Sequence, residues 1–562
     1  MRESTITFEP TLLCDFTPLV RNALSISNPV CTRIVFRPGR YDFHPELAVE
    51  KYLFISNNDE GLKRIAIPIF GRACFEIEAT GARFVFHGGI LPIAAVGCSA
   101  LTLRGFSLDW EVPFHGEAEV LDTDAAGVLL KIREGFAYQV RSGHLAFGGG
   151  PFTLRNVLAF DARRRETAFQ TRDNYGIENR YVAREVGERV VRLDARLSDP
   201  LPIPGDILAL VGERRDYPGV FLDGCSDVLL EDVTIRHACG MGVIGQHCSE
   251  VTLQRVTVAP DAQSGRMIST TADATHFVHC QGRVRLLDCV FENQMDDATN
   301  IHGIYAQVAG YSAADGLLVR LRHHQQFGVP FALPGHRLEL ARQATLASFH
   351  ESVALGVEVL NKEFLRIALA EPPSCEPIPG DVVANMSWNP EVEIRGCRSR
   401  GNRARGFLIS SAGRVVIEDN DFHTPGAAIL VASDARDWFE SGPVRDLIIR
   451  RNRFETCNYG VWGQAAIQIA PRIERPDPSL PPYHGDIRIE DNTFTVFDPR
   501  IVFARSVRNL RITGNHIVSS DAYPPQNAQA PSWDLSTCHC VNTERHTHPP
   551  DTKSRTDCAA VF

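Results

Sequence analysis

Short triplets of an apolar, a polar and an apolar residue recur along the chain and predict strands rather than helices. Alternation with a period of two residues is typical of a strand that buries one face. The triplets begin at Leu101, Val228, Val251, Val284, Val392, Val415, Leu447, Ile487 and Leu510. Three of the intervals, Val228 to Val251, Val392 to Val415 and Ile487 to Leu510, are each 23 residues long. A repeat of this length, with several short strands and loops of variable size, predicts an all-β protein built on a right-handed parallel β-helix.

An asparagine stands five residues after the start of four triplets. These residues are Asn420, Asn452, Asn492 and Asn515. Asparagine tolerates the left-handed turn conformation, and stacked side-chain amides can hydrogen-bond from one coil to the next. We therefore predict a structural asparagine ladder and not a set of ligands.

Two long segments interrupt the repeat, and both are rich in alternating strands. They end in similar stretches at residues 202–208 and 377–383, which predicts two small inserted β-barrels or sandwiches that flank or roof a binding face. A helix-like stretch at residues 16–23 is expected to cap the open end of the stacked strands. The predicted units are a cap with the first coils at 1–111, a first barrel at 112–214, coils at 215–304, a second barrel at 305–389, coils at 390–517 and a poorly ordered tail at 518–562.

Charge and hydropathy exclude several classes of protein. A net charge of −10 and a pI near 6.0 argue against nucleic-acid binding and against a basic membrane-attracting patch. No apolar run approaches the roughly 20 residues of a membrane span. Because no basic region precedes an apolar stretch at the N-terminus, we expect a cytoplasmic protein, or a secreted or periplasmic one if a leader has been removed. The 15 cysteines are scattered singly, so we expect reduced, mostly buried thiols and no metal site.

The densest group of chemically active side chains lies in residues 293–303, around the adjacent Asp296 and Asp297. Asp273 lies 23 positions before Asp296, one repeat length, so we expect it in the neighbouring coil, roughly 4.8 Å away. Adjacent side chains on a strand face opposite sides, and a buried unpaired carboxylate is costly, so the pair is expected at a strand end. Like charges this close raise the pKa of one member, which leaves a proton donor beside ionised neighbours, as in a glycosidase.

The repeat register brings further side chains to the same face. They are Arg403, Arg405, Asp434, Trp438, Glu440, Tyr459 and Trp462. Other interpretations of these residues stay open. The carboxylates and amides would suit a calcium ion, His302 could be a structural histidine, and Trp438 and Trp462 could be core aromatics rather than surfaces on which sugars stack.

On these residues the chain resembles glycoside hydrolase family 110, the exo-acting α-1,3-galactosidases. The resemblance lies in residues 272–277, 295–303, 438–442 and 458–463 and covers most of the chain to about residue 517. It implies an inverting enzyme, without metal or cofactor, that removes terminal α-1,3-linked galactose from a glycan, in some members from the branched blood group B antigen. The acidic trio is also similar to that of β-helical polygalacturonases, where the first Asp of the pair is the acid.

Together the two resemblances imply a role for each aspartate. Asp296 would be the general acid, and Asp273 with Asp297 would be the base that holds the attacking water. The residues expected to bind substrate are Asn300, His302, Arg405, Trp438, Glu440 and Trp462.

Three other functions remain open at this stage. The chain could be another β-helical glycan hydrolase of the polygalacturonase kind. A polysaccharide lyase would need a basic proton abstractor, usually with Ca²⁺, and would release an unsaturated product. A non-catalytic glycan-binding solenoid would bind without turnover.

Overall fold

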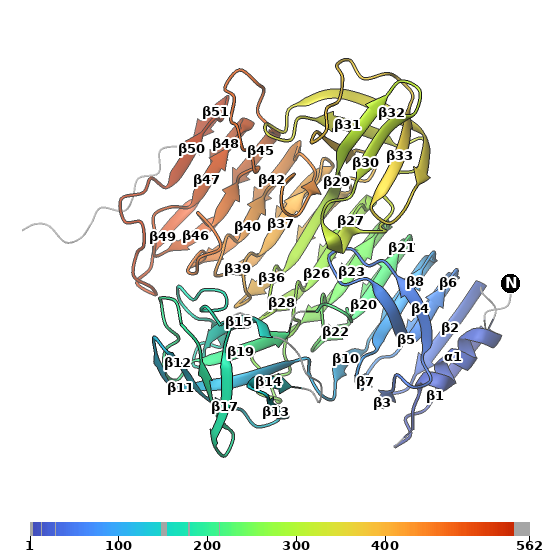
Figure 1. The fold of residues 1–562 in the computed structure, drawn as a ribbon, viewed down its shortest axis with the longest axis vertical. Helices are drawn as coiled ribbons and strands as arrows, with labels where there is room; N and C mark the ends of the chain where they lie inside the picture. The colour runs from blue at the N-terminus through green and yellow to red at the C-terminus, as the bar shows by residue number, and fades with distance from the viewer. Residues whose placement is uncertain are drawn as a thin grey trace, which may run out of the picture.

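A computed structural model of the chain describes residues 4–12, 14–27, 30–147, 154–177, 180–212 and 214–543. Its body is the predicted parallel β-helix, in which successive coils stack from the N-terminal to the C-terminal end, with the two insertions on opposite sides of the stack in the view of Figure 1. Each coil contributes a strand to up to three parallel sheets. The apolar side chains of all three sheets meet in one long core, which includes Leu230, Leu253 and Leu286.

The first sheet has thirteen strands. In spatial order they are β1 (Ser4–Phe8), β2 (Val30–Phe36), β6 (Ala73–Glu78), β9 (Ser99–Arg104), β21 (Ser226–Glu231), β24 (Ser249–Gln254), β27 (Gln281–Leu287), β35 (Glu391–Arg395), β38 (Arg414–Glu418), β42 (Asp446–Arg450), β45 (His484–Glu490), β48 (Val507–Thr513) and β51 (Val541–Thr543). The predicted triplets pair directly with one another here, from Leu101 with Val228 to Ile487 with Leu510, which confirms the register of the repeat.

The second and third sheets complete the coils. The second consists of β3 (Gly39–Phe43), β7 (Ala82–Phe86), β10 (Ser107–Trp110), β22 (Thr234–Ile235), β25 (Thr257–Val258), β28 (Val290–Glu292), β36 (Arg398–Arg400), β39 (Asp421–His423), β43 (Arg453–Glu455), β46 (Thr493–Val496) and β49 (His516–Ser519). The parallel strands of the third are β5 (Gly61–Phe70), β8 (Leu91–Val96), β20 (Val220–Asp223), β23 (Val243–Gln246), β26 (Thr275–Val278), β29 (Thr299–Ser312), β37 (Phe407–Ser410), β40 (Ile429–Val431), β44 (Ile467–Ile469), β47 (Val502–Arg505) and β50 (Trp533–Ser536). Two antiparallel strands border this sheet, β4 (Val49–Leu53) on β5 and β41 (Glu440–Ser441) on β29.

The N-terminal end is closed by a helix, as predicted. Helix α1 (Thr17–Ile26) buries Val20 and Leu24 in the same core as Phe36 and Tyr41. The coils themselves begin earlier than the triplets suggested, because β1, β2 and β6 already pair in parallel ahead of β9. No membrane-spanning helix is found among the described residues, since none is both long and apolar enough.

The first insertion, between β10 and β20, forms an antiparallel sheet around its own core. Its strands are β11 (His115–Asp124), β12 (Gly127–Ile132), β15 (Leu154–Asp161), β16 (Glu166–Thr167), β17 (Val182–Gly187), β18 (Val190–Asp194) and β19 (Ile207–Gly212), with a separate hairpin of β13 (Tyr138–Arg141) and β14 (His144–Phe147). The described residues that connect it to the β-helix, 111–114 and 214–219, belong to no helix or strand.

The second insertion closes into a barrel that shares a strand with the β-helix. Its other strands are β30 (Gly316–Arg320), β31 (Arg337–Ala341), β32 (Ser348–Val359), β33 (Phe364–Leu369) and β34 (Val382–Asn385), with the short helix η1 (His324–Gln326). The first residues of β29, Thr299 to His302, pair with β26 and β37 in the helix. Its later residues pair with β34 and β30 in the barrel. The boundary drawn between residues 304 and 305 therefore falls inside one strand.

The prediction that the periodicity ends at Ile517 is wrong for residues up to Thr543. Strand β50 pairs with β47, and β51 pairs with β48, so the coils continue. Trp533 and Leu535 pack on the core in the same alternating pattern as earlier coils, but the polar, proline-containing loop before them hides this pattern. Residues 544–562, the last part of the predicted tail, lie outside the described residues.

The asparagine ladder is confirmed. Asn420 Nδ2 donates to Asn452 Oδ1 (2.9 Å), Asn452 Nδ2 to Asn492 Oδ1 (2.9 Å) and Asn492 Nδ2 to Asn515 Oδ1 (3.0 Å). Each Oδ1 also accepts the backbone N–H of the preceding asparagine in the ladder.

Asn452→Ala should therefore destabilise the C-terminal coils. The substitution leaves the backbone N–H of Asn420 and one of the two Nδ2 hydrogens buried without an acceptor, while Nδ2 keeps its bond to the Ile394 carbonyl. Each unsatisfied donor costs about 1–3 kcal/mol. Thermal unfolding of the variant should begin at a lower temperature than in the wild type. The control is Asn509→Ala on the solvent-facing side of β48; an equal effect there would contradict a special role for the ladder.

Candidate active site

A cavity of ≈ 500 Å³ opens beside the third sheet, where β26, β29, β37, β40 and β44 lie side by side. Its polar lining residues are Asn57, Arg215, Asp273, His276, Asp296, Asp297, Asn300, Arg405, Ser410, Ser433, Asp434, Trp438, Glu440, Gln468 and Arg472. All three predicted catalytic aspartates are in this set, and so are Asn300, Arg405, Trp438 and Glu440. The cavity thus brings together residues from the N-terminal coils, the central coils and the loop before β41.

Two residues predicted to bind substrate are not part of the lining. His302 is 1% exposed and lies beneath the cavity, against His276. The indole nitrogen of Trp462 instead donates to Asp173 of the first insertion (3.1 Å). Tyr459, placed on the same face by the repeat register, is fully buried and stacks on His423 and Tyr523.

The aspartates are positioned by the ends of two neighbouring strands. Thr275 at the start of β26 pairs with Thr299 at the start of β29, an offset of 24 residues. Asp273 is therefore level with Asp297, and not with Asp296 as the 23-residue interval suggested. Both acids of the pair precede β29, so the expectation of a strand end agrees with their place in the fold.

Two arginines hold Asp296 in its ionised form. Arg215 Nη2 donates to Oδ2 and Arg403 Nη1 donates to Oδ1, each at 3.0 Å. Burial alone would raise the pKa of Asp296, but Arg403, Arg215 and Arg405 together hold it below its usual range. If Asp296 is the general acid, the bound glycan must weaken its contacts with the arginines before Asp296 can carry a proton.

The other two carboxyl groups respond in the opposite direction. Burial raises the pKa of Asp273 well above its usual range, and the charge of Asp296 adds to this effect. Burial also raises the pKa of Asp297 well above its usual range, although Arg405 opposes it by donating its backbone N–H (3.0 Å) and Nη2 (2.8 Å). The like charges thus favour protonation of Asp273 and Asp297 in the free protein, whereas the sequence favoured one donor at Asp296.

The first insertion reaches the trio through one arginine. Asp173 accepts two hydrogen bonds from Arg403, both of 2.8 Å, and Arg403 in turn donates to Asp296. The contacts between Asp173 and Arg403 span 230 positions in the sequence, so no local pattern could have indicated Asp173.

The opposite side of the cavity is built around Glu440. Asn57 Nδ2 and Asn300 Nδ2 each approach its carboxylate at 3.4 Å. Trp438 is 42% exposed at the cavity edge and lies against His323. The backbone N–H groups of Arg436, Asp437 and Trp438 all donate to Asp434, which fixes the loop that carries this indole. An exposed indole above polar side chains is a surface on which a sugar ring can stack.

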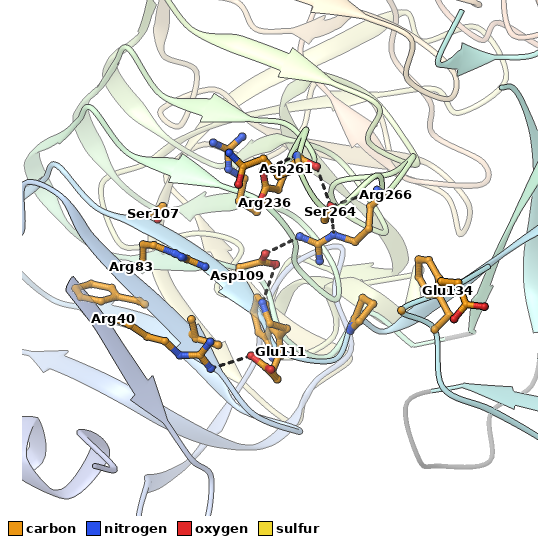
Figure 2. Close-up of a pocket in the computed structure, with 17 residues that line it drawn as sticks. Arg40, Arg83, Ser107, Asp109, Glu111, Glu134, Arg236, Asp261, Ser264 and Arg266 are labelled. Atoms are coloured by element: carbon orange, nitrogen blue, oxygen red, sulfur yellow. Dashed lines mark hydrogen bonds and ion pairs between the residues drawn. The ribbon is translucent and has the colours of Figure 1, made fainter. Parts of the chain in front are cut away.

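A second cavity, of ≈ 450 Å³, lies on the outer side of the second sheet beside the first insertion (Figure 2). Its arginines and carboxyl groups are balanced in number: Arg40, Arg83, Arg236 and Arg266 against Asp109, Glu111, Glu134 and Asp261. Arg40 pairs with Glu111, and Arg266 pairs with Asp109. None of the residues predicted for catalysis or substrate binding lines it. Within the described ranges, no group of three or more His, Cys, Asp or Glu side chains is arranged to hold a metal ion.

Comparison with known proteins shows the family to which the chain belongs. The chain is 37% identical over 503 residues to α-1,3-galactosidase A of Shewanella woodyi, with 88% of this chain and 82% of the relative covered. It is 31% identical over 549 residues to α-1,3-galactosidase B of Bacteroides thetaiotaomicron, with 95% and 88% covered. The chain belongs to glycoside hydrolase family 110.

Both insertions of this family 110 enzyme match models of its relatives. Residues 116–208 match the GLAA-B beta-barrel domain I, and residues 316–383 match the GLAA-B beta-barrel domain II. Among solved structures, a family 28 exopolygalacturonase from Yersinia enterocolitica aligns with 98% of the family 110 chain and 79% of its own, at 11% identity and a TM-score of 0.37.

Proposed function

We propose that the chain hydrolyses terminal α-1,3-linked galactose from the non-reducing end of a glycan, with inversion at the anomeric carbon. The single observation that carries the proposal is the gathering of Asp273, Asp296 and Asp297 in one cavity with an exposed indole at its edge. Two carboxyl groups acting as acid and base are what glycoside hydrolysis requires. The names of the relatives support galactose as the sugar and the α-1,3 bond as the linkage.

In the proposed reaction, Asp296 donates a proton to the glycosidic oxygen as the bond from the anomeric carbon breaks. A water molecule held by Asp273 and Asp297 attacks the opposite face of the anomeric carbon and gives up a proton to one of these two carboxyl groups. The carboxyl groups of acid and base should then lie roughly 6.5–9.5 Å apart, because an inverting enzyme must leave room for the water. Arg405 keeps the Asp297 carboxylate fixed during the attack.

Hydrolysis of a linear α-1,3-digalactoside should release β-galactose first. Attack from the face opposite the leaving group inverts the α configuration, so proton NMR at early times should show the β anomer before mutarotation mixes the two. An initial α anomer would mean a retaining route and would make the assigned roles wrong. If no galactose were released, the proposed substrate would be wrong. The 2-fucosylated digalactoside, measured in parallel, tells whether branched blood group B structures are also cleaved.

The reaction as proposed uses no metal ion, since proton transfer is assigned to the carboxyl groups. Dialysis against a chelator should leave the rate of galactose release unchanged. Loss of activity that Ca²⁺ restores, together with an ultraviolet-absorbing product, would favour a polysaccharide lyase.

A further inference from the structure

A row of hydrogen bonds runs beneath the cavity from the backbone to one catalytic aspartate. His302 Nδ1 lies 2.7 Å from the carbonyl oxygen of Gly303, His302 Nε2 lies 2.9 Å from His276 Nε2, and His276 Nδ1 lies 2.6 Å from Asp273 Oδ2. The three side chains are nearly inaccessible, at 1% exposed for His302, 2% for His276 and 3% for Asp273. Each proton between two atoms of this row must belong to one of the two.

The Gly303 carbonyl fixes the direction of the row. A carbonyl oxygen can only accept, so His302 must carry its proton on Nδ1. In a neutral imidazole the other nitrogen is then an acceptor. His302 Nε2 consequently accepts the bond that joins the two rings, and His276 Nε2 donates it.

The direction continues to the aspartate. With its proton on Nε2, a neutral His276 presents a lone pair at Nδ1. An ionised carboxylate also has only acceptors, and two acceptors cannot face each other at 2.6 Å. The proton between them must then belong to Asp273 Oδ2.

The surroundings favour neutral groups throughout. Burial lowers the pKa of His276 to about 4, although Glu440 opposes this, and burial also lowers the pKa of His302. Asp273 is faced by Asp296, Asp297 and Glu440, which favour its protonation, and by Arg215 and Arg405, which oppose it.

Two other distributions of protons would fit the same atoms. In the first, the proton between His276 and Asp273 lies on Nδ1, so that a doubly protonated His276 faces an ionised Asp273. Burial lowers the pKa of His276 and raises that of Asp273, and so disfavours this charged pair. In the second, the charge lies on His302. Glu440 Oε1 lies 3.5 Å from His302 Nε2. An imidazolium at His302 could donate to Glu440 and His276 together, and His276 Nδ1–H would then face an ionised Asp273. This arrangement puts a cation in a fully buried position at a long contact, which burial disfavours.

We propose that His302 and His276 hold Asp273 as a neutral, protonated carboxyl group in the free enzyme, so that the proton of the attacking water passes to Asp297. His276 and His302 are positioning residues, and Asp273 contributes an uncharged acceptor that orients the water. The part that concerns Asp297 rests on the proposed inverting reaction, whereas the protonation of Asp273 does not. For the protons to balance, the one that burial favours on Asp297 in the free protein passes to Asp296 when the glycan binds. Asp296 then gives this proton to the leaving oxygen, Asp297 takes one from the attacking water, and Asp273 keeps its own, so the free-protein state is restored.

Nitrogen-15 NMR of histidine-labelled protein at neutral pH tests the row directly. We expect His276 to be protonated only at Nε2 and His302 only at Nδ1, with the two signals assigned by their loss in His276→Gln and His302→Gln. A His276 that is protonated at Nδ1, alone or together with Nε2, would overturn the proposal. His484, a fully buried histidine whose Nδ1 accepts the Val444 N–H, is the reference in the same spectrum.

Infrared spectroscopy gives an independent measurement on the aspartate. The wild type should show carbonyl absorption from protonated carboxyl groups at neutral pH, and Asp273→Asn should lose a component of it that Asp297→Asn keeps. Asp273→Asn should also leave the His276 tautomer unchanged, because an amide N–H donates to Nδ1 as the carboxyl O–H does. A spectrum of Asp273→Asn identical to that of the wild type would overturn the proposal. None of these measurements depends on turnover. A failure of the proposed galactosidase activity can therefore be told apart from a failure of the proposed protonation of Asp273.

Discussion

Asp296→Asn should lower the rate of hydrolysis of an α-1,3-digalactoside by roughly 10²–10⁴-fold, the usual contribution of a general acid. The amide keeps the size of the carboxyl group and can still face Arg215 and Arg403, so the fold should persist. Hydrolysis of α-galactosyl fluoride should survive much better, because fluoride leaves without protonation. Initial rates on the two substrates measure the difference.

The same pair of substrates separates the acid from the base. Asp297→Asn should lose activity on both, since the attacking water still needs a proton acceptor. Asp122→Asn, at an exposed position of the first insertion, controls for effects of the substitution itself. If Asp297→Asn retained fluoride hydrolysis and Asp296→Asn did not, the roles of the two residues would be exchanged, as the raised pKa of Asp297 would allow.

Arg403→Met should destabilise the protein by about 3 kcal/mol at neutral pH and also abolish most activity. The arginine connects Asp296 and Asp173, and removing one partner of a buried ion pair leaves its carboxylates uncompensated. We place the value at the low end of the expected range because the side chain of Asp173 is 36% exposed and water screens part of the interaction.

The pH dependence identifies the cause of this loss. The pKa values of Asp173 and Asp296 are both depressed in the folded protein, against the effect of burial, chiefly by Arg403. The stability that the two ionised carboxylates contribute is therefore present above the unfolded pKa of about 3.9 and is lost as the pH falls through their lower folded pKa values. Urea denaturation should show a large difference between variant and wild type near neutral pH and a small one near pH 3. Arg508→Met, which removes an exposed pair with Asp486, should change little at either pH, and a loss independent of pH in Arg403→Met would point to packing instead.

The local repeat predicted much of the fold and the centre of the site. Triplets, ladder asparagines and the Asp273 to Asp297 region all lie in consecutive coils, where spacing along the chain translates into distance between coils. Asn57, Arg215 and Asp173 could not be found in this way, because each lies outside the triplet pattern that places the aspartates. Trp462 illustrates the converse, since its register was correct but its indole is engaged by Asp173 from the first insertion.

The protonation states were also beyond the sequence. Adjacent like charges predicted that one carboxyl group would be protonated, but which one depends on where the arginines lie. Arg215 and Arg403 select Asp296 as the ionised member. Arg403 follows the second insertion and Arg215 follows the first, so only the folded chain brings the two cations to the same carboxylate.

The first insertion should be easier to exchange between homologous enzymes than the second, because the second shares strand β29 with the β-helix. The first shares no strand with the β-helix, so a homologous unit could be exchanged for it if its contacts with the coils, through Asp173, Glu117 and Glu166, are rebuilt. The second begins inside the strand that carries Asn300 and His302, and the same strand holds β41 with Glu440. Replacing the second insertion at this point would interrupt β29 and remove the pairing that holds β41 at the cavity wall. Chimaeras that alter which glycans are accepted should therefore exchange the first insertion as a block, and should vary the second only in the loops between β30 and β34.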